Sequence, residues 1–122
     1  MIRVKKTSGK ISLRIQALCL GKDFCVTVSG GDQEHIGAVA LAIPHPSQKD
    51  KNKISATVSI LAIPGHKEDE LAKNVARKIA VALNATVSVS CGIHIDNAET
   101  QEIENIIATV MDMTDTMIHK LV

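Results

Sequence analysis

Aromatic side chains are almost absent from this chain of 122 residues, in which Phe24 is the single aromatic residue and neither Trp nor Tyr occurs. The core must therefore be built from Ile, Val, Leu, Ala and Met. Proteins that bind single-stranded nucleic acid usually stack bases on aromatic platforms, so this shortage argues against nucleic acid as a partner. The formal net charge of +1 agrees, because it supplies no strong field toward nucleic acid or an anionic membrane.

Long apolar runs are missing as well. No stretch approaches the roughly 20 residues that are needed to span a bilayer. The opening Met1-Ile2-Arg3-Val4-Lys5-Lys6 also lacks the apolar segment of a signal peptide. The sequence therefore predicts a cytoplasmic protein with no membrane partner.

Cysteine is scarce and irregularly spaced. Cys19, Cys25 and Cys91 give an odd count without CxxC or zinc-like spacing, which is typical of a reduced intracellular protein. If Gly21-Lys22 forms the centre of a hairpin turn, Cys19 lies opposite Phe24. This register places Cys25 on the other face of the hairpin from Cys19. We therefore expect core thiols and no disulfide between these two.

Hydrophobic residues make up 45% of the chain and alternate with polar residues over much of its first half. The first such run has Ile11 and Leu13 on one side and Ser12 and Arg14 on the other, which is typical of a half-buried antiparallel strand. The strand expected over residues 36–43 should end before Pro44. The strand expected over residues 86–90 should be central in its sheet. The expected strands cover residues 11–20, 24–29, 36–43, 54–63 and 86–90.

Two later stretches have the 3.6-residue period of amphipathic helices. The first is expected to end at Asn84, and the second to run from about residue 98 to residue 121, with Asn97 or Asp96 as its cap. The second apolar stripe is wider than a small sheet needs, so pairing in a homodimer and packing within one chain both remain open. The first stripe consists of Leu71, Val75, Ile79 and Leu83.

Strands clustered before helices predict an α+β fold in a single domain over residues 1–122. We expect a mainly antiparallel sheet of five to six strands, with two helices packed on one face. The expected order is β-β-β-β-α-β-α.

Three short stretches set glycine beside histidine and an acid, each where a strand-like run gives way to a loop or a helix start. Such boundaries gather backbone N–H groups and short polar side chains for ligands, so we expect a ligand or partner surface there. The candidate binding residues are Gly30, Gly31, Asp32, His35 and Gly37 in the first stretch, Gly65, His66 and Lys67 in the second, and His94, Asp96 and Asn97 in the third.

Each stretch also has a simpler interpretation. Free N–H groups at Gly65 and the charge of Lys67 favour a phosphate or carboxylate, whereas the acids at 68–70 would satisfy the helix start without a ligand. Gly30-Gly31-Asp32 is typical of a turn. Gly37, inside a predicted strand, instead indicates close approach by another group.

Metal binding and catalysis have weaker signals. The histidines of the three stretches, with Asp32 or Asp96, are the residue types of a zinc site, but their long-range spacing specifies nothing, and we expect no metal. No GxSxG, GxGxxG or Walker sequence occurs, and nothing singles out a nucleophile. For His94, partial burial with partners inside the protein is the commoner situation.

The same stretches resemble a known family. Ser29-Gly30-Gly31-Asp32, His35-Ile36-Gly37-Ala38-Val39-Ala40, the run from Pro64 to Glu70 and the run from Gly92 to Asn97 resemble the prenylated-flavin chaperones typified by LpdD. The resemblance covers roughly residues 11–120. That family accompanies UbiD-type decarboxylases, including those acting on gallate-like hydroxybenzoates. Its fold is similar to that of proteasome-assembly chaperones, which work as dimers.

The resemblance implies a non-enzymatic chaperone that binds or delivers prenylated FMN, or assists maturation of the decarboxylase. The implied partners are a second copy of the chain, a UbiD-type decarboxylase and a flavin prenyltransferase. The flavin phosphate would lie on the N–H groups from Gly65 to Lys67, and His35 or His94 would hydrogen-bond the polar edge of the ring, with aliphatic residues over its faces.

Two alternatives remain. The first is a protein-assembly chaperone or interaction scaffold that binds no flavin. The second is an enzyme with His35 or His94 as a general base.

Overall fold

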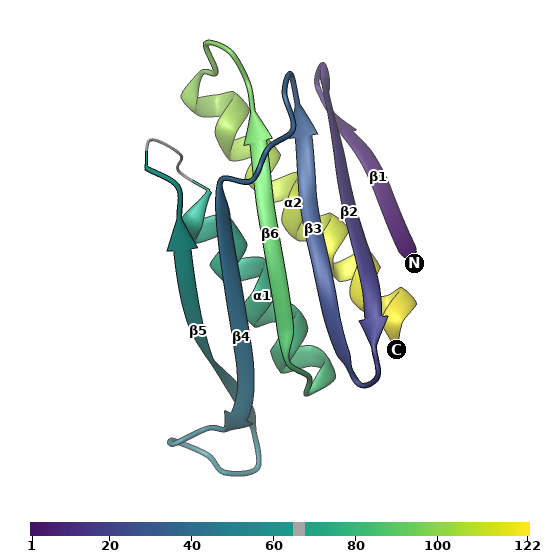
Figure 1. The fold of residues 1–122 in the computed structure, drawn as a ribbon, viewed down its shortest axis with the longest axis vertical. Coiled ribbons are helices and arrows are strands. Elements are labelled where there is room, and N and C mark those ends of the chain that lie inside the picture. The colour runs from purple at the N-terminus through teal and green to yellow at the C-terminus, as the bar shows by residue number, and fades with distance from the viewer. Residues whose placement is uncertain (65–67) are drawn as a thin grey trace.

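A six-stranded sheet with two helices on one of its faces makes up the protein (Figure 1). The structure is a computed structural model that describes residues 1–64 and 68–122. No helix within these ranges is long and apolar enough to cross a membrane. The elements are β1 (Ile2–Ser8), β2 (Ile11–Leu20), β3 (Asp23–Gly31), β4 (Ala38–Pro46), β5 (Ile54–Ala62), α1 (Asp69–Leu83), β6 (Val87–His94) and α2 (Thr100–Leu121).

The strand order is β1-β2-β3-β6-β4-β5. β6 therefore lies between two antiparallel units, pairing parallel with β3 and antiparallel with β4. The α+β class, the mainly antiparallel sheet, its central last strand and the two helices on one face are all confirmed, with one parallel pair in addition. Because β3 and β6 run in the same direction, their carboxyl ends lie side by side, with Gly31 opposite His94.

The sequence prediction missed β1, so the true order is β-β-β-β-β-α-β-α. Ile2 and Val4 alternate with Arg3 and Lys5, and this short run pairs with β2 at the edge of the sheet. Charged side chains are common on edge strands, where they hinder pairing with other chains, and here they obscured the strand pattern.

Strand β4 also differs from the prediction, because it continues through Pro44 to Pro46. Its pairing with β6 ends at Ala42, while its pairing with β5 continues to Pro46. Beyond Ala42 the strand has a neighbour on one side only, and a proline nitrogen is tolerated where it faces no second strand.

The first hairpin has the predicted register, with Cys19 opposite Phe24 and Cys25 on the other face. All three cysteines are free thiols. The expectation that they are core thiols holds for Cys91 alone, since Cys19 is exposed and Cys25 is partly exposed. Cys19 lies next to the turn at the end of β2, where alternation no longer guarantees burial.

Aliphatic side chains fill the space between the sheet and the helices, as the shortage of aromatics requires. α1 covers β4, β5 and β6, while α2 packs on β1 and β2. The apolar stripe of α2 is therefore used within its own chain, which was one of the two open alternatives. Its buried members are Ile106, Val110, Met113 and Met117.

The helix ends follow the sequence in part. α1 ends as predicted at Asn84, which takes the left-handed conformation with φ 49°. α2 is capped by Glu99 rather than by Asn97 or Asp96, through a capping box in which Glu99 and Glu102 each accept from the other's backbone N–H. Asp96 and Asn97 belong instead to the turn that precedes the helix.

Candidate functional site

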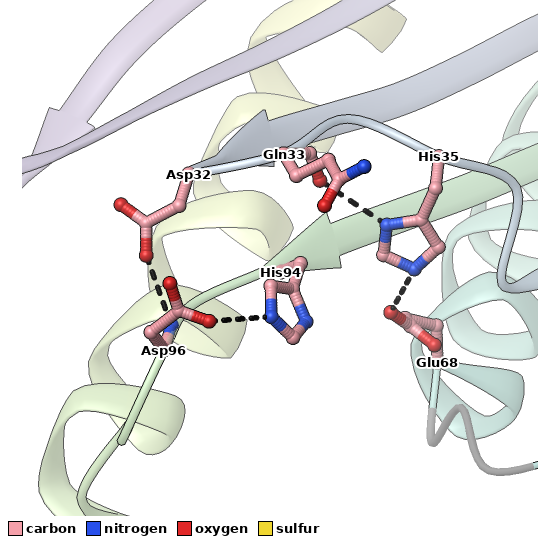
Figure 2. Close-up of polar contacts among 6 residues, drawn as sticks. All are labelled: Asp32, Gln33, His35, Glu68, His94 and Asp96. Carbon is pink, nitrogen blue, oxygen red and sulfur yellow. Dashed lines mark hydrogen bonds and ion pairs between the residues drawn. The ribbon is translucent and has the colours of Figure 1, made fainter.

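The first and third predicted stretches meet at the carboxyl ends of β3 and β6, and the second contributes Glu68, which contacts His35 (Figure 2). The Asp32 N–H donates to the carbonyl of His94 at 2.7 Å, and the Asp96 N–H donates to Asp32 Oδ2 at 2.9 Å. A third bond, from the Gly37 N–H to the carbonyl of Cys91, is 2.9 Å long. The loop after β3 is thus fastened to the end of β6 at both of its ends.

Glycine permits this close contact between the two backbones. Gly31 has a φ of +83°, and a Cβ there would overlap the carbonyl of His94. At Gly92 the backbone conformation is ordinary, but a Cβ would overlap the carbonyl of His35. The turn predicted at Gly30-Gly31-Asp32 begins later than expected, because Gly30 and Gly31 still belong to β3 and the chain bends from Asp32. Gly31 and Gly92 are needed instead for the strand ends to approach.

His35 forms the most enclosed polar contact of the site. Its Nδ1–H donates to the carbonyl of Gln33 at 3.2 Å, and its Nε2 lies 3.0 Å from Glu68 Oε1. The side chains of His35 and Glu68 are only 18% and 12% exposed. Both ring nitrogens of His35 therefore face oxygen atoms, one of a backbone carbonyl and one of a carboxylate.

The other oxygen of Glu68 sits against Gly37. Oε2 is buried and has no hydrogen-bond partner among the residues that the structure describes. A Cβ on Gly37 would overlap this atom. Gly37 lies just before β4 and not inside a strand as predicted, but the close approach predicted from this glycine is present, and the approaching group is a carboxylate. A buried oxygen without a partner is costly, which makes Glu68 a candidate acceptor for a ligand N–H.

A second histidine–acid pair lies beside the first (Figure 2). His94 Nε2 is 2.9 Å from Asp96 Oδ1, with side chains 45% and 76% exposed. The rings of His94 and His35 meet edge to face, with centroids 6.1 Å apart. His94 is thus a histidine with internal partners, as the commoner interpretation had it.

A cavity of about 320 Å3 opens next to these residues. Its volume is at the small end of the range for small-molecule sites. Its walls are aliphatic, and its polar lining comes from Glu68, Glu70 and His94. The aliphatic lining residues are Leu71, Ile93, Ile95, Ala98, Ile103, Ile106 and Ile107.

Cys91 lies under the same cluster. Burial raises the pKa of its thiol from the ordinary 9.0 to about 12, and the nearby Glu68 carboxylate adds to the rise. The thiol therefore stays protonated at neutral pH, and a reactive thiolate is not favoured there.

The remaining predicted residues divide into two groups. Asn97 occupies a left-handed turn with φ 57°, and Gly30 lies at the end of β3 against Ser12. Gly65, His66 and Lys67, with the proposed phosphate position, lie outside the described residues. In the ranges that are described, no group of three histidine, cysteine or acidic side chains is placed to hold a metal ion.

Sequence reasoning missed Glu68 and the isoleucines of α2. Glu68 was interpreted as one of three acids at the helix start, yet its side chain makes no cap hydrogen bond and turns to His35 instead. Gly37 signalled a close neighbour without identifying it. Ile103 and Ile107 looked like part of the helix stripe, although both are partly exposed at the cavity.

Comparison with known proteins gives a family and a fold. The sequence model of the prenylated flavin chaperone LpdD-like domain matches residues 7–122. No curated protein matches the chain. Among solved structures, a chain from the crystal structure of a novel chaperone complex for yeast 20S proteasome assembly is similar, with a TM-score of 0.52. The two chains are 16% identical, over 96% of this chain and 95% of that one. At this identity the likeness shows the fold alone.

Proposed function

The chain belongs to the prenylated flavin chaperone LpdD-like family, and on that premise we propose that it binds prenylated FMN and delivers it to a UbiD-type decarboxylase, or assists the decarboxylase in maturing. The proposed substrates of that decarboxylase are hydroxybenzoates such as gallate-like acids. A flavin prenyltransferase is the proposed source of the ligand. The protein itself acts as a chaperone and not as an enzyme.

The observation that carries this proposal is the aliphatic cavity beside Glu68. An apolar group added to a flavin is stabilised by burial against aliphatic side chains, and the isoleucine walls supply these without any aromatic residue. Glu68 lines the same cavity and has an oxygen that lacks a partner in the described structure. The residues present therefore fit the ring and prenyl portion of the ligand.

Charge indicates how the ligand is oriented. Glu68 and Glu70 line the cavity and Asp96 lies next to His94, so a phosphate dianion is disfavoured inside. We place the ring and prenyl portion in the cavity and the phosphate outside it. The stretch from Gly65 to Lys67 remains our proposed phosphate position.

Titration of the purified protein with FMN and with prenylated FMN tests the proposal. We expect saturable binding of the prenylated form, weakened by His66→Ala at the phosphate and by Ile103→Ala at the cavity. Truncating a half-exposed isoleucine removes about 1 kcal/mol of contact, or roughly a fivefold rise in Kd. Ile43→Ala is the matched control, because Ile43 is 49% exposed and Ile103 is 47% exposed, and Ile43 lies outside the cavity.

Absence of binding by both flavins would contradict the carrier role. Equal weakening by Ile103→Ala and Ile43→Ala would contradict the cavity as its site.

A second candidate function is a protein-assembly chaperone without a flavin. The fold shared with a chain of a proteasome-assembly chaperone complex favours it. The discriminating experiment is capture of the decarboxylase by the purified protein after all flavin has been removed. A complex that persists without cofactor supports the assembly role, and one that forms only with prenylated FMN supports the carrier role.

A further inference from the structure

The two edges of the sheet differ in how they are protected against pairing with another chain (Figure 1). β1 forms one edge and carries Arg3, Lys5 and Lys6 along its length, and charged side chains are a common protection of this kind. β5 forms the other edge, and its nine residues include no charged side chain and no proline. Such a strand at a sheet edge is a template for pairing with an extended segment.

The register of β5 shows which of its backbone groups point away from the sheet. Pro44 of β4 has no N–H and lies opposite Ala56, so this is a pair without hydrogen bonds. Such pairs alternate with hydrogen-bonded pairs along an antiparallel ladder. The bond from the Ile63 N–H to the Gly37 carbonyl, 2.8 Å long, has the same phase. The N–H and C=O groups that point away from β4 therefore belong to Ile54, Ala56, Val58, Ile60 and Ala62.

Among the residues that the structure describes, these outward groups have no other backbone partner. β5 has β4 as its single neighbour in the sheet, and α1 packs on its face. In the same ranges, no backbone hydrogen bond outside the ladder to β4 uses an N–H or C=O of residues 54–62. An added strand can therefore form main-chain hydrogen bonds along the whole of β5.

Side chains on the helix side of β5 also favour an added strand. Val58 and Ile60 are partly buried and pack against the margin of the core. A neighbouring strand with aliphatic side chains on the same side of the sheet would remove their remaining exposed surface from water. Because successive side chains of a strand alternate between the two faces, the added segment should alternate aliphatic and polar residues.

Charge at the start of β5 indicates a further property of the added segment. The loop directly before the strand carries Lys49, Lys51 and Lys53, all exposed, and one acid, Asp50. An acidic residue beside Lys53 would complement this positive excess. Antiparallel pairs are slightly more stable than parallel ones, and in an antiparallel pair the carboxyl end of the added segment lies beside Lys53.

A second copy of β5 would not supply this acid. Paired antiparallel about a two-fold axis at Val58, the copy would place its Ile63 beside Lys53. Residues 54–64 contain no acidic side chain. The charge at this edge therefore favours a segment of a different protein over a second copy of the chain.

We propose that β5 is the docking edge for an extended segment of a partner protein, which adds to the sheet antiparallel to β5. Aliphatic side chains of the segment lie beside Val58 and Ile60, and an acidic residue at its carboxyl end lies beside Lys53. This proposal does not rest on flavin binding, since no β5 residue lines the cavity beside Glu68.

Amide exchange measured by NMR tests the proposal, with a synthetic peptide as the probe. The peptide has capped ends, alternates valine with threonine over the length of β5 and ends in a pair of glutamates. In the free chain, the outward N–H groups of Val58 and Ile60 should exchange faster than the inward ones of Thr57 and Ser59. Addition of the peptide should slow exchange at Val58 and Ile60.

Val58→Pro is the blocking variant. It removes an N–H that faces away from β4, so the internal ladder stays complete, while the added strand loses a donor and meets the proline ring. We expect the Kd of the peptide to rise about tenfold or more. Lys5→Pro is the matched control on the other edge, because the two-residue turn between Ser8 and Ile11 leaves the Lys5 N–H facing outward in the same way. It should bind the peptide as the wild type does.

A charge exchange tests the same edge without altering its backbone. Lys53→Glu should weaken binding of the glutamate peptide about threefold and strengthen binding of a peptide that ends in a pair of lysines by a similar factor. Circular dichroism checks that each variant is folded. If Val58→Pro does not fold, the charge exchange decides the outcome.

Failure of the wild type to bind the glutamate peptide would overturn the proposal. So would unchanged binding by folded Val58→Pro, or a preference between the two peptides that Lys53→Glu leaves as it was. Slow exchange of the outward N–H groups before peptide is added, which disappears on dilution, would mean that a second copy occupies the edge and would overturn the proposal as well.

Discussion

The two histidine–acid pairs of the site have the same chemistry in different surroundings. His35 and Glu68 are 18% and 12% exposed and join residues 33 positions apart. His94 and Asp96 are 45% and 76% exposed and are only two positions apart. Their distances, 3.0 and 2.9 Å, are nearly equal.

Burial and sequence separation therefore decide what each pair does. Water screens the exposed pair, which adds little to stability. The buried pair connects the loop after β3 to the start of α1. When one partner is removed, the other stays buried, where water cannot take the place of the lost partner. The first pair is a structural connection, and the second lies at the surface beside the cavity.

The largest effect is expected from His35→Ala. This change leaves the Glu68 carboxylate buried without its partner, which costs about 3 kcal/mol of unfolding free energy. Urea denaturation monitored by circular dichroism measures the loss. A loss no larger than that of His94→Ala would show that burial does not distinguish the pairs.

A smaller loss, roughly 1–3 kcal/mol, is expected from Gly37→Ala. Its Cβ would overlap Glu68 Oε2, while its backbone is not in the left-handed region. The double variant Gly37→Ala/Glu68→Ala serves as the control, because the added methyl group then has room. Additive losses in this double-mutant cycle would contradict a direct contact.

The pKa of Cys91, which the nearby Glu68 carboxylate helps to raise, makes the stability of the protein depend on alkaline pH. Its thiol pKa is about 12 in the folded protein and near 9.0 when exposed, so the unfolded chain loses this proton first as pH rises. Stability should therefore fall between pH 9 and 12, by about 1.4 kcal/mol per pH unit at most. Denaturation at several alkaline pH values measures this slope, and Cys91→Ala should reduce it. The absence of tyrosine removes one competing titration in this range.

Comparison of Glu68→Gln with Asp96→Asn tests which of the two acids affects Cys91. Removing the Glu68 charge should lower the Cys91 pKa and move the alkaline loss of stability to lower pH. Asp96→Asn should leave that loss where it is. A shift of equal size in both variants would mean that the Cys91 pKa depends no more on the charge of Glu68 than on the charge of Asp96.

The smallest effect is expected from Asp96→Ala. An exposed ion pair contributes about 0.2–1 kcal/mol, and salt weakens it further. Denaturation at low and high salt measures both quantities. A loss as large as that of His35→Ala, unaffected by salt, would contradict the assignment of this pair to the surface.

Local patterns were reliable where a short stretch of chain decides the structure. Alternation of Ile11 and Leu13 with polar residues predicted β2, and Gly21-Lys22 predicted the register of the first hairpin. Asn84 predicted the end of α1. Prediction was poorer where the structure of a segment depends on residues that are close in space but distant in the sequence. β4 passes through Pro44 because its pairing with β6 stops at Ala42. The cap of α2 is Glu99, while the Asp96 side chain is bonded to His94 instead.

The candidate site shows the same division. The sequence marked Gly31, His35 and His94, because glycine and histidine at strand ends are unusual enough to notice. It did not identify Glu68 as the partner of His35, since an acid at the start of a helix has a local explanation. It also did not separate Ile103 and Ile107 from the buried stripe of α2, because the period of a helix does not reveal which apolar residues border a cavity.

By itself, the sequence determined an aliphatic α+β fold with two amphipathic helices and three glycine–histidine stretches, because periodicity and turn chemistry act over a few residues. Only the tertiary structure decided which stretches meet, which histidine–acid pair is buried and which sheet face stays open. Those outcomes depend on β6 entering between β3 and β4, which brings together residues far apart in the chain. Burial is a property of that assembly, and no local pattern encodes it.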